Sequence, residues 1–286
     1  MIIDGIKPVV HLTMNEGSGT PHDSSDYIGS FPGYIGGSAV WSSEKSLTGG
    51  ASIHFDGSQG HVSLGDSTSL VPASAFSLSI WVYADSITGW HRMISRYTTG
   101  GNPEYSYMLA TNDGVGRVRF LIYPSSNTGV GVKLITDDVV LTENRWHHVV
   151  ATYSGGDTRM KIYIDGALVS STLDPSADTS IPSSIRVSSA DTALGSNYGG
   201  SQSSHQTWNG NLDEFSLWDV ELTEVQVAKL YLYGSKGGWL SLGGVSDLVD
   251  FSLGANSNGS YVSAYLTRDS EASNICLLYT SDAADE

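Results

Sequence analysis

The sequence predicts an all-β protein folded as a sandwich or jelly roll, with one short helix towards the C-terminal side. Three observations lead to this fold class. About a dozen short segments alternate their side chains on a two-residue period, and clusters of Gly, Ser, Asn and Asp separate them. Glycine is abundant, at 33 of 286 residues, which suits a chain with many turns. Only one segment carries a helix signal, and many short strands with a single helix are typical of packed β-sheets.

The first half of the chain contains most of the predicted strands. Residues 15–37, after the first strand, are rich in Ser, Asp and Gly and are expected to form a loop. Within residues 76–83, apolar side chains fill one face and Ser77, Ser79 and Trp81 occupy the other, so this strand is expected in the middle of a sheet. The predicted strands of this half are residues 8–14, 51–55, 61–64, 76–83, 93–97, 105–111, 118–123 and 133–136.

Residues 145–173 form the centre of the pattern and predict an antiparallel meander of three strands. Residues 146–153 and 159–164 alternate, and a Ser-Gly-Gly-Asp turn separates them. Asp165 and Gly166 then offer the two positive-φ positions of a tight hairpin, so residues 167–173 are expected to run back. His147 and His148 are neighbours on a strand, so their side chains should point to opposite faces and cannot easily share a metal.

The last strands and the helix follow the meander. Residues 185–187, 192–195 and 210–218 are predicted strands, and a Gly/Ser-rich loop covers residues 197–204. Thr223 and Gln226 have the spacing of a capping box, in which each side chain bonds to the other residue's backbone N–H. The apolar positions after them predict a helix of about two turns.

The domain boundaries follow from where the alternation weakens. We expect one domain over residues 1–233, and a linker with the truncated start of a further segment over residues 234–275. The last 11 residues, 276–286, resemble the in-frame translation of a sequencing adapter. They are therefore expected to be a non-native tail, with the gene truncated at about Ile275.

Composition and charge restrict the function classes. The formal net charge is −16, and a chain without a basic stripe is not expected to bind nucleic acid. No run of 18 apolar residues exists, so no membrane insertion is expected, and no secretory signal is visible at the N-terminus. The acidity fits an extracellular or virion surface. The single cysteine, Cys276, excludes an internal disulfide framework.

Several separated segments carry a family resemblance. They are His11–Thr20 with residues 23–25, residues 54–58 with His61 and Val62, residues 76–83, residues 146–166, and residues 210–219 with the helix after them. In this order they resemble the laminin-G-like, concanavalin A-like jelly-roll family over about residues 8–233. The resemblance implies two antiparallel sheets packed face to face, with the first and last strands adjacent. It does not fix a function, because this fold serves lectins, adhesion modules, pentraxin-like proteins and some glycanases.

The resemblance also implies a calcium ion at the rim of the sandwich. If the first and last strands are neighbours, Glu16 and Asp213 approach one another, and calcium takes six to eight oxygen ligands. The alternative is that Asp23 and Asp56 cap turns and that the remaining acids are solvated or bonded to backbone. The candidate metal ligands are Glu16, Asp23, Asp56, Asp213 and Glu214.

Aromatic side chains in or beside loops are candidate ligand contacts, because a sugar ring stacks on Trp and Tyr at low entropic cost. The alternative for each is packing over an end of the sandwich. Trp90, Tyr198 and Trp208 are preferred because their surroundings are rich in Gly and Ser. The full candidate set is Trp90, Tyr105, Tyr198, His205 and Trp208.

Catalysis is not expected. The Glu-x-Asp-x-x-Glu pattern of the jelly-roll glucanases that this fold resembles is absent, and Asp219 and Glu221 form only a generic pair. The leading hypothesis is a non-enzymatic recognition module that binds carbohydrate or a surface partner through loops at one sandwich end, stabilised by calcium. The alternatives are a structural domain of a phage or virus particle, such as a tail fibre or capsid decoration, and an accessory domain of a polysaccharide-active enzyme.

Overall fold

The computed structural model describes residues 2–20, 30–47, 50–98, 104–125, 130–196 and 206–235, and three short strands within residues 250–277. The chain divides into two compact units, residues 1–238 and 239–286. In the second unit, β17 (Asp250–Ala255), β18 (Val262–Thr267) and β19 (Ile275–Leu277) pair antiparallel in that order. The first unit carries the candidate site.

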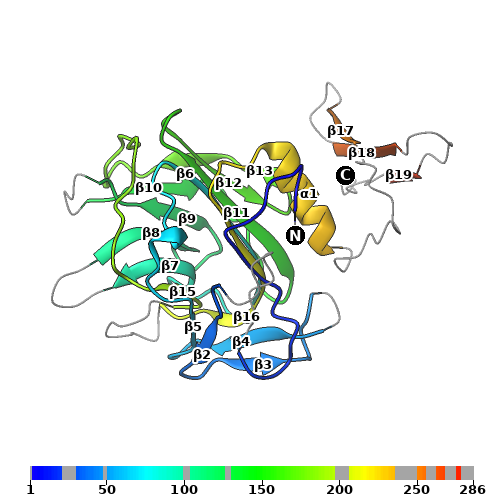
Figure 1. The fold of residues 1–286 in the computed structure, drawn as a ribbon. Helices are drawn as coiled ribbons and strands as arrows, with labels where there is room; N and C mark the ends of the chain where they lie inside the picture. Colours follow the sequence, from blue (N-terminus) through cyan, green and yellow to red (C-terminus); the bar gives the residue numbers. More distant parts are fainter. Residues whose placement is uncertain are drawn as a thin grey trace. The chain divides into compact units, whose positions relative to one another are not determined.

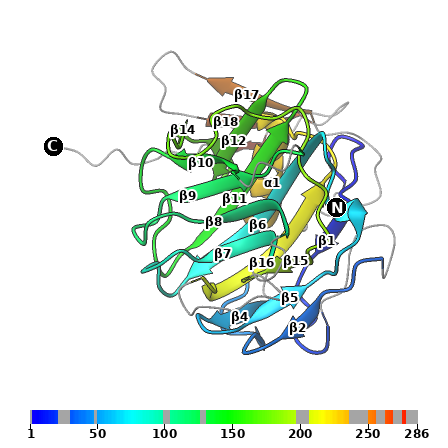
Figure 2. The ribbon, with the colours of Figure 1, turned by 90° about the vertical axis from the view of Figure 1, so that its left-hand side faces the viewer.

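The first unit is a sandwich of two antiparallel sheets of eight strands each (Figures 1 and 2), so the predicted fold class is confirmed. We call the sheets helix-side and tyrosine-side, after what lies on their outer faces. In spatial order the helix-side sheet contains β13 (Ala167–Leu168), β12 (Arg159–Ile164), β11 (Trp146–Ser154), β6 (Ala75–Ala84), β16 (Asn209–Trp218), β4 (Ser52–Asp56) and β3 (Val40–Ser42), with β1 (Val10–Leu12) paired to β16. The tyrosine-side sheet contains β14 (Ser171–Leu173), β10 (Val132–Thr136), β9 (Val118–Ile122), β8 (Glu104–Thr111), β7 (Arg92–Thr98), β15 (Thr192–Leu194), β5 (His61–Ser63) and β2 (Tyr34–Gly36).

Strand β6 lies in the middle of its sheet, as its alternation predicts. It pairs with β11 on one side and β16 on the other. Phe76, Leu78 and Ile80 are fully buried in the core between the sheets. Ser77 and Trp81 are buried too, on the opposite face, which requires a cover there. A single 3₁₀ turn, η1 (Thr68–Leu70), precedes this strand.

The cover is helix α1 (Glu224–Ser235), which Figure 1 shows on the outer side of the sheet that contains β11. Its capping box is formed as predicted: Thr223 N donates to Gln226 Oε1 (2.9 Å) and Gln226 N donates to Thr223 Oγ1 (3.3 Å). The helix has 12 residues, longer than the two turns expected. Among the described residues, no helix has the length and apolar character to cross a membrane.

The first and last strands of the sandwich are adjacent, which confirms the topology implied by the resemblance. Strand β1 pairs with β16, with Val10 opposite Leu217. The pairing of β16 with β6 shifts register between Asp213 and Ser216, and Glu214 there has φ +49°. Such a bulge re-aims side chains, so these two consecutive acids do not follow simple alternation.

The central meander is confirmed for two strands and corrected for the third. Asp165 (φ +51°) and Gly166 (φ +84°) make the predicted tight turn. Residues 167–173 do not form one strand, however, because Ala167–Leu168 pairs with β12 whereas Ser171–Leu173 pairs with β10 of the other sheet. The alternation of a strand does not identify its partner, so the crossing between sheets was not visible in the sequence.

Four further segments differ from the prediction. Strand β2 lies within the stretch expected to be loop, and β3 lies just after it. Each has only three residues, which is too short for alternation to be recognised in the sequence. Residues 185–187 form no strand, and Ile185 makes only an isolated bridge to Pro124. The first strand is shorter than the predicted residues 8–14.

Candidate functional site

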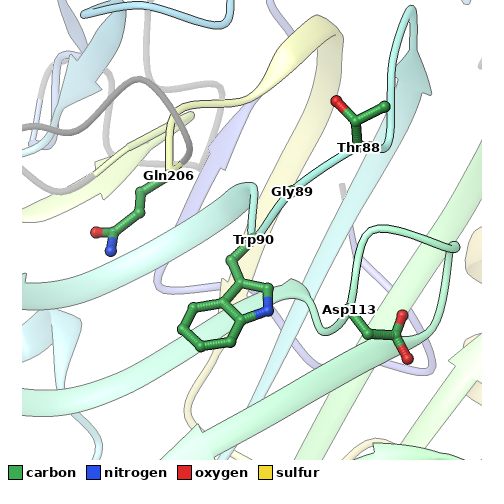
Figure 3. Close-up of a pocket in the computed structure, with 5 residues that line it drawn as sticks. All are labelled: Thr88, Gly89, Trp90, Asp113 and Gln206. Carbon is green, nitrogen blue, oxygen red and sulfur yellow. The ribbon is translucent and has the colours of Figure 1, made fainter.

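Trp90 lies at a surface pocket formed by three separate segments (Figure 3). Trp90 is 52% exposed and lies two residues before the start of strand β7. The pocket has a volume of about 260 Å³ and is lined by Thr88, Gly89, Trp90, Asp113 and Gln206. Thr88 and Gly89 come from the β6–β7 loop, Asp113 from the β8–β9 turn, and Gln206 from the residues before β16. The predicted placement of Trp90 in a loop, open to solvent, is confirmed.

A glycine allows two of these segments to lie close together. Gly114 has φ +73°, and a Cβ at this position would lie 3.1 Å from the carbonyl carbon of Thr88. The neighbouring Asp113 is held by Arg117, with which it forms an ion pair, and accepts a hydrogen bond from Val115 N (3.3 Å). The turn is therefore fixed by its own side chain, and the wall of the pocket is preorganised.

A cation lies on the indole of Trp90. The guanidinium carbon of Arg119, from strand β9, is 5.0 Å from the centroid of the Trp90 ring. This is a cation–π distance. The side chain links the pocket to the outer face of the tyrosine-side sheet.

Three tyrosines stack on that same outer face. Tyr97 of β7 and Tyr105 of β8 have ring centroids 4.6 Å apart, and Tyr105 and Tyr123 are also 4.6 Å apart. Burial, followed by the neighbouring Tyr97, raises the pKa of the Tyr105 phenol. The guanidinium of Arg92 lies 5.1 Å from the Tyr97 ring. The candidate Tyr105 is therefore part of an aromatic and cationic cluster rather than an isolated loop residue.

The prediction for Trp208 is wrong. This side chain is only 1% exposed and belongs to the main core. Its indole N–H donates to the carbonyl of Tyr83 (3.3 Å), and its ring meets His91 edge-on. Trp208 comes immediately before strand β16, and the Gly/Ser-rich neighbourhood that suggested exposure ends before it. It packs in the core, so it does not contact a ligand.

Three candidates lie outside the described residues. Tyr198, His205 and Asp23 fall in residues 197–205 and 21–29. Their roles as ligand contacts or metal ligands stay predictions.

Asp56 caps a turn, which is the alternative to metal binding considered for this residue. Its Oδ1 accepts hydrogen bonds from Ser58 N (3.0 Å) and Ser58 Oγ (2.7 Å), and Ser38 Oγ donates to it at 2.5 Å. It also lies opposite Asn209 in the β4–β16 pairing, four positions along the strand from Asp213. At about 3.4 Å per residue these two acids are separated by more than 10 Å of strand.

Asp213 and Glu214 are the buried acids of the set. Asp213 is fully buried, and its Oδ2 accepts from Leu47 N (3.1 Å). Burial, with the like charges of Glu214 and then Glu16, raises the pKa of Asp213 well above its usual value. Glu214 Oε2 lies 2.7 Å from His11 Nε2. Glu16 is close enough to Asp213 to act on its pKa, and a shared metal site for the two carboxylates stays a prediction.

These residues fit a calcium ion only in part. The like charges around Asp213 favour a cation, but Asp213 already accepts two backbone N–H groups and Glu214 binds His11. In the described part of the chain, no three His, Cys, Asp or Glu side chains are grouped as metal ligands. Calcium would need backbone carbonyls and water to complete its six to eight oxygen ligands. The calcium site stays a prediction.

A laminin-G-type family model, described as the concanavalin A-like lectin/glucanases superfamily, matches residues 56–228. The chain belongs to this superfamily. The matched region contains Trp90, both arginines and all three stacked tyrosines. The superfamily includes binding proteins and enzymes, so membership establishes the fold and not the ligand.

Two curated relatives are similar in sequence at a low level. The pentraxin-related protein PTX3 of Mus musculus is 24% identical over 171 residues, which cover 58% of this chain and 42% of PTX3. A protein of Rattus norvegicus with sushi, von Willebrand factor type A, EGF and pentraxin domains is 24% identical over 158 residues, 54% of this chain and 4% of its own length. The chain thus spans less than half the length of either relative.

Solved structures show the same fold at low identity. Domain 4 of AbnA, an extracellular arabinanase from Geobacillus stearothermophilus solved with arabinotriose, aligns with a TM-score of 0.54 at 20% identity, covering 79% of this chain and 98% of that domain. The binding domain of botulinum neurotoxin serotype G aligns with a TM-score of 0.56 at 14% identity, covering 96% and 65%. These similarities support the concanavalin A-like fold.

The sequence interpretation missed the basic residues of the site. Arg92 and Arg119 were not singled out, and neither were Thr88, Asp113 or Gln206. One signal was available: the alternation of residues 118–123 places Arg119, with Leu121 and Tyr123, on one strand face. A charge in the middle of an otherwise apolar strand face indicates a site more strongly than a loop aromatic does.

Proposed function

We propose that this member of the superfamily is a non-enzymatic recognition module that binds carbohydrate on the surface around Trp90. One observation carries the proposal: a tryptophan that is 52% exposed stands at a preorganised pocket with polar walls. A flat indole face stacks on the C–H face of a sugar ring, and Thr88, Asp113 and Gln206 offer hydrogen-bonding groups for its hydroxyls.

The comparisons support this class of ligand without naming one. The superfamily is named after lectins and glucanases. The structure of domain 4 of AbnA was solved in complex with arabinotriose. At 20% identity the ligand of that domain does not transfer to this chain. The extracellular setting of that arabinanase and the acidic composition of this chain support a location outside the cell or on a virion.

Calcium is the second part of the proposal. Burial, followed by the like charges of Glu214 and Glu16, raises the pKa of Asp213, and a cation beside these acids would offset the like-charge part. If calcium binds there, 2 mM calcium raises the thermal midpoint of the protein relative to EDTA, and Asp213→Asn removes that difference. Equal midpoints in calcium and EDTA would overturn this part only.

The experiment for the carbohydrate site is binding of the full chain to a broad panel of polysaccharides, with three proteins compared. Trp90→Ala is expected to weaken binding at least about tenfold, the size typical of an aromatic hot spot. Tyr34→Ala is the matched control, because Tyr34 is an exposed aromatic (59%) on edge strand β2 and does not line the pocket. Absence of binding to every glycan would overturn the proposal and favour the structural, virion-type alternative.

A further inference from the structure

Two arginines lie in one cross-strand row on the outer face of the tyrosine-side sheet. Arg92 of β7 is paired with Ala110 of β8, and Ala110 is paired with Arg119 of β9. Residues directly opposite one another share a face, so all three side chains belong to the same surface. The outer strands of the row are roughly 9–10 Å apart, and the single methyl group of Ala110 lies between them. The row therefore places two guanidinium groups on either side of a small residue.

Both arginines are withdrawn from water. Arg92 is only 3% exposed, and Arg119 is partly buried beside Met108 and Leu121, which are themselves buried. Burial, together with the like charge of Arg119, lowers the pKa of Arg92 to about 10. Burial also lowers the pKa of Arg119. Keeping two cations in such a place costs free energy that surface arginines do not cost.

Arg119 pairs with no carboxylate among the described residues. Its NH2 group contacts Met108 Sδ (3.7 Å), its guanidinium lies on Trp90, and its Nε atom is buried with no acceptor among those residues. The side chains that act electrostatically on Arg119 are Tyr123 and Tyr97, and no acid of the described residues is among them. This contrasts with the described basic side chains that have an acidic partner: Lys45, Arg117, Lys133, Arg145, Arg159, Lys161, Arg186 and Lys229.

The chain has 30 acidic residues and a net charge of −16, so the lack of an acidic partner for Arg119 is not due to a shortage of acids. A partly buried cation without an acidic partner, beside an exposed aromatic ring, indicates a site whose anion comes from a ligand. The guanidinium fork matches a carboxylate in two parallel hydrogen bonds. Around it, Trp90 and the three stacked tyrosines offer flat aromatic faces.

We infer that the Arg119 guanidinium, with Arg92 as the second cation, binds the carboxylate of an acidic saccharide whose ring stacks on Trp90. This inference rests on the proposed function and narrows its ligand to sugars that carry a carboxyl group, such as uronic and sialic acids. The aromatic surface contributes the sugar contact and the arginine pair contributes the selection for charge.

The test uses saccharides that differ only in the carboxyl group. Polygalacturonate is compared with its methyl ester, chondroitin with its carboxyl-reduced form, and sialyllactose with lactose. Chondroitin sulfate is added to separate carboxylate from sulfate recognition. We expect at least one acidic member to bind at least about tenfold more tightly than its neutral partner, with weakening at high salt.

Three variants assign this selectivity to the arginine. Arg119→Met removes the charge at similar volume and should abolish the preference for the acidic member. Arg119→Lys keeps the charge without the planar fork and should retain part of it. Arg145→Met is the matched control, because Arg145 is 64% exposed and pairs with Asp165 on the helix-side sheet. Circular dichroism and thermal midpoints show that each variant is folded, and if Arg119→Met does not fold, Arg119→Lys carries the test.

The outcomes separate the inference from the proposed function. Equal binding of acidic and neutral members, sensitive to Trp90→Ala but not to Arg119→Met, overturns the inference and leaves the carbohydrate site intact. Binding of chondroitin sulfate alone overturns the assignment to a carboxylate. Absence of binding to any saccharide overturns both.

Discussion

The two outer faces of the sandwich carry the same kinds of side chain and use them differently. On the helix-side sheet, Trp81 stacks on His148 (5.0 Å) and on Tyr231 of helix α1 (5.5 Å), and His148 Nε2 lies 2.8 Å from Ser79 Oγ. On the tyrosine-side sheet, the indole that stacks on a cationic side chain is Trp90. Trp81 is 4% exposed and Trp90 is 52% exposed.

The difference shows what a covering helix does to polar and aromatic residues. Beneath α1, Trp81 stacks on His148 and on Tyr231 of the helix, and His148 bonds to Ser79, so the face serves stability. The only α-helix of the described residues covers the helix-side sheet, and the tyrosine-side face keeps a cation without an acid beside an exposed indole. Residues of one type therefore take a structural or a binding role according to which face they occupy.

Truncation of each tryptophan should have the largest effect and should differ most between the two faces. Trp81→Ala should lower the free energy of unfolding by about 3–5 kcal/mol, because it removes a large buried side chain from between the sheet and the helix. Trp90→Ala should change it by less than about 1 kcal/mol, since half of that ring is already in water. Urea unfolding followed by circular dichroism measures both. Similar losses in the two variants would contradict the division into a structural and a binding face.

A second test uses pH, and its effect is smaller. Burial lowers the pKa of His148 to about 3, whereas an unfolded histidine titrates near 6.5. Between these values the unfolded chain binds a proton that the folded chain does not, so stability falls as pH drops from about 6.5 towards 3, by up to about 1.4 kcal/mol per pH unit. The slope of unfolding free energy between pH 6 and pH 4 should be shallower by that amount in His148→Gln, which keeps a hydrogen-bonding side chain beside Ser79. Parallel slopes in the two proteins would show that His148 is not buried as a neutral group.

The smallest effect is expected from removing the N-terminal cap of helix α1. Thr223→Ala removes the side chain that accepts from Gln226 N and should cost about 1 kcal/mol of stability. Because the cap lies away from Trp90 and Arg119, saccharide binding should not change. Thermal unfolding and the polysaccharide panel together check this, and a loss of binding would mean that the two faces are coupled through the core.

The sequence predicted those parts of the fold whose signals are local. The alternation of β6, the positive-φ pair Asp165 and Gly166, and the capping box of Thr223 and Gln226 each appear in the structure as predicted. Each depends on residues within about ten positions of one another. Pairing partners do not, which explains why the crossing between β13 and β14 was missed.

The site was less predictable for the same reason. Trp90 could be recognised because its loop is rich in small and polar residues, but the same argument failed for Trp208, whose burial depends on distant segments. The arginine row requires three strands to be aligned in register, and Arg92 and Arg119 are 27 positions apart in the sequence. Only the fold brings them to one surface.

The outermost strands of both sheets are very short, and this has a consequence for how the protein behaves at high concentration. β13 and β3 at the edges of one sheet have two and three residues, and β14 and β2 at the edges of the other have three each. An exposed edge presents unpaired N–H and C=O groups to any passing strand, and a short edge offers few of them. The long strands, which would be the best templates for strand addition, are all internal. Strand addition at the described edges of these two sheets is therefore disfavoured when copies of the protein meet.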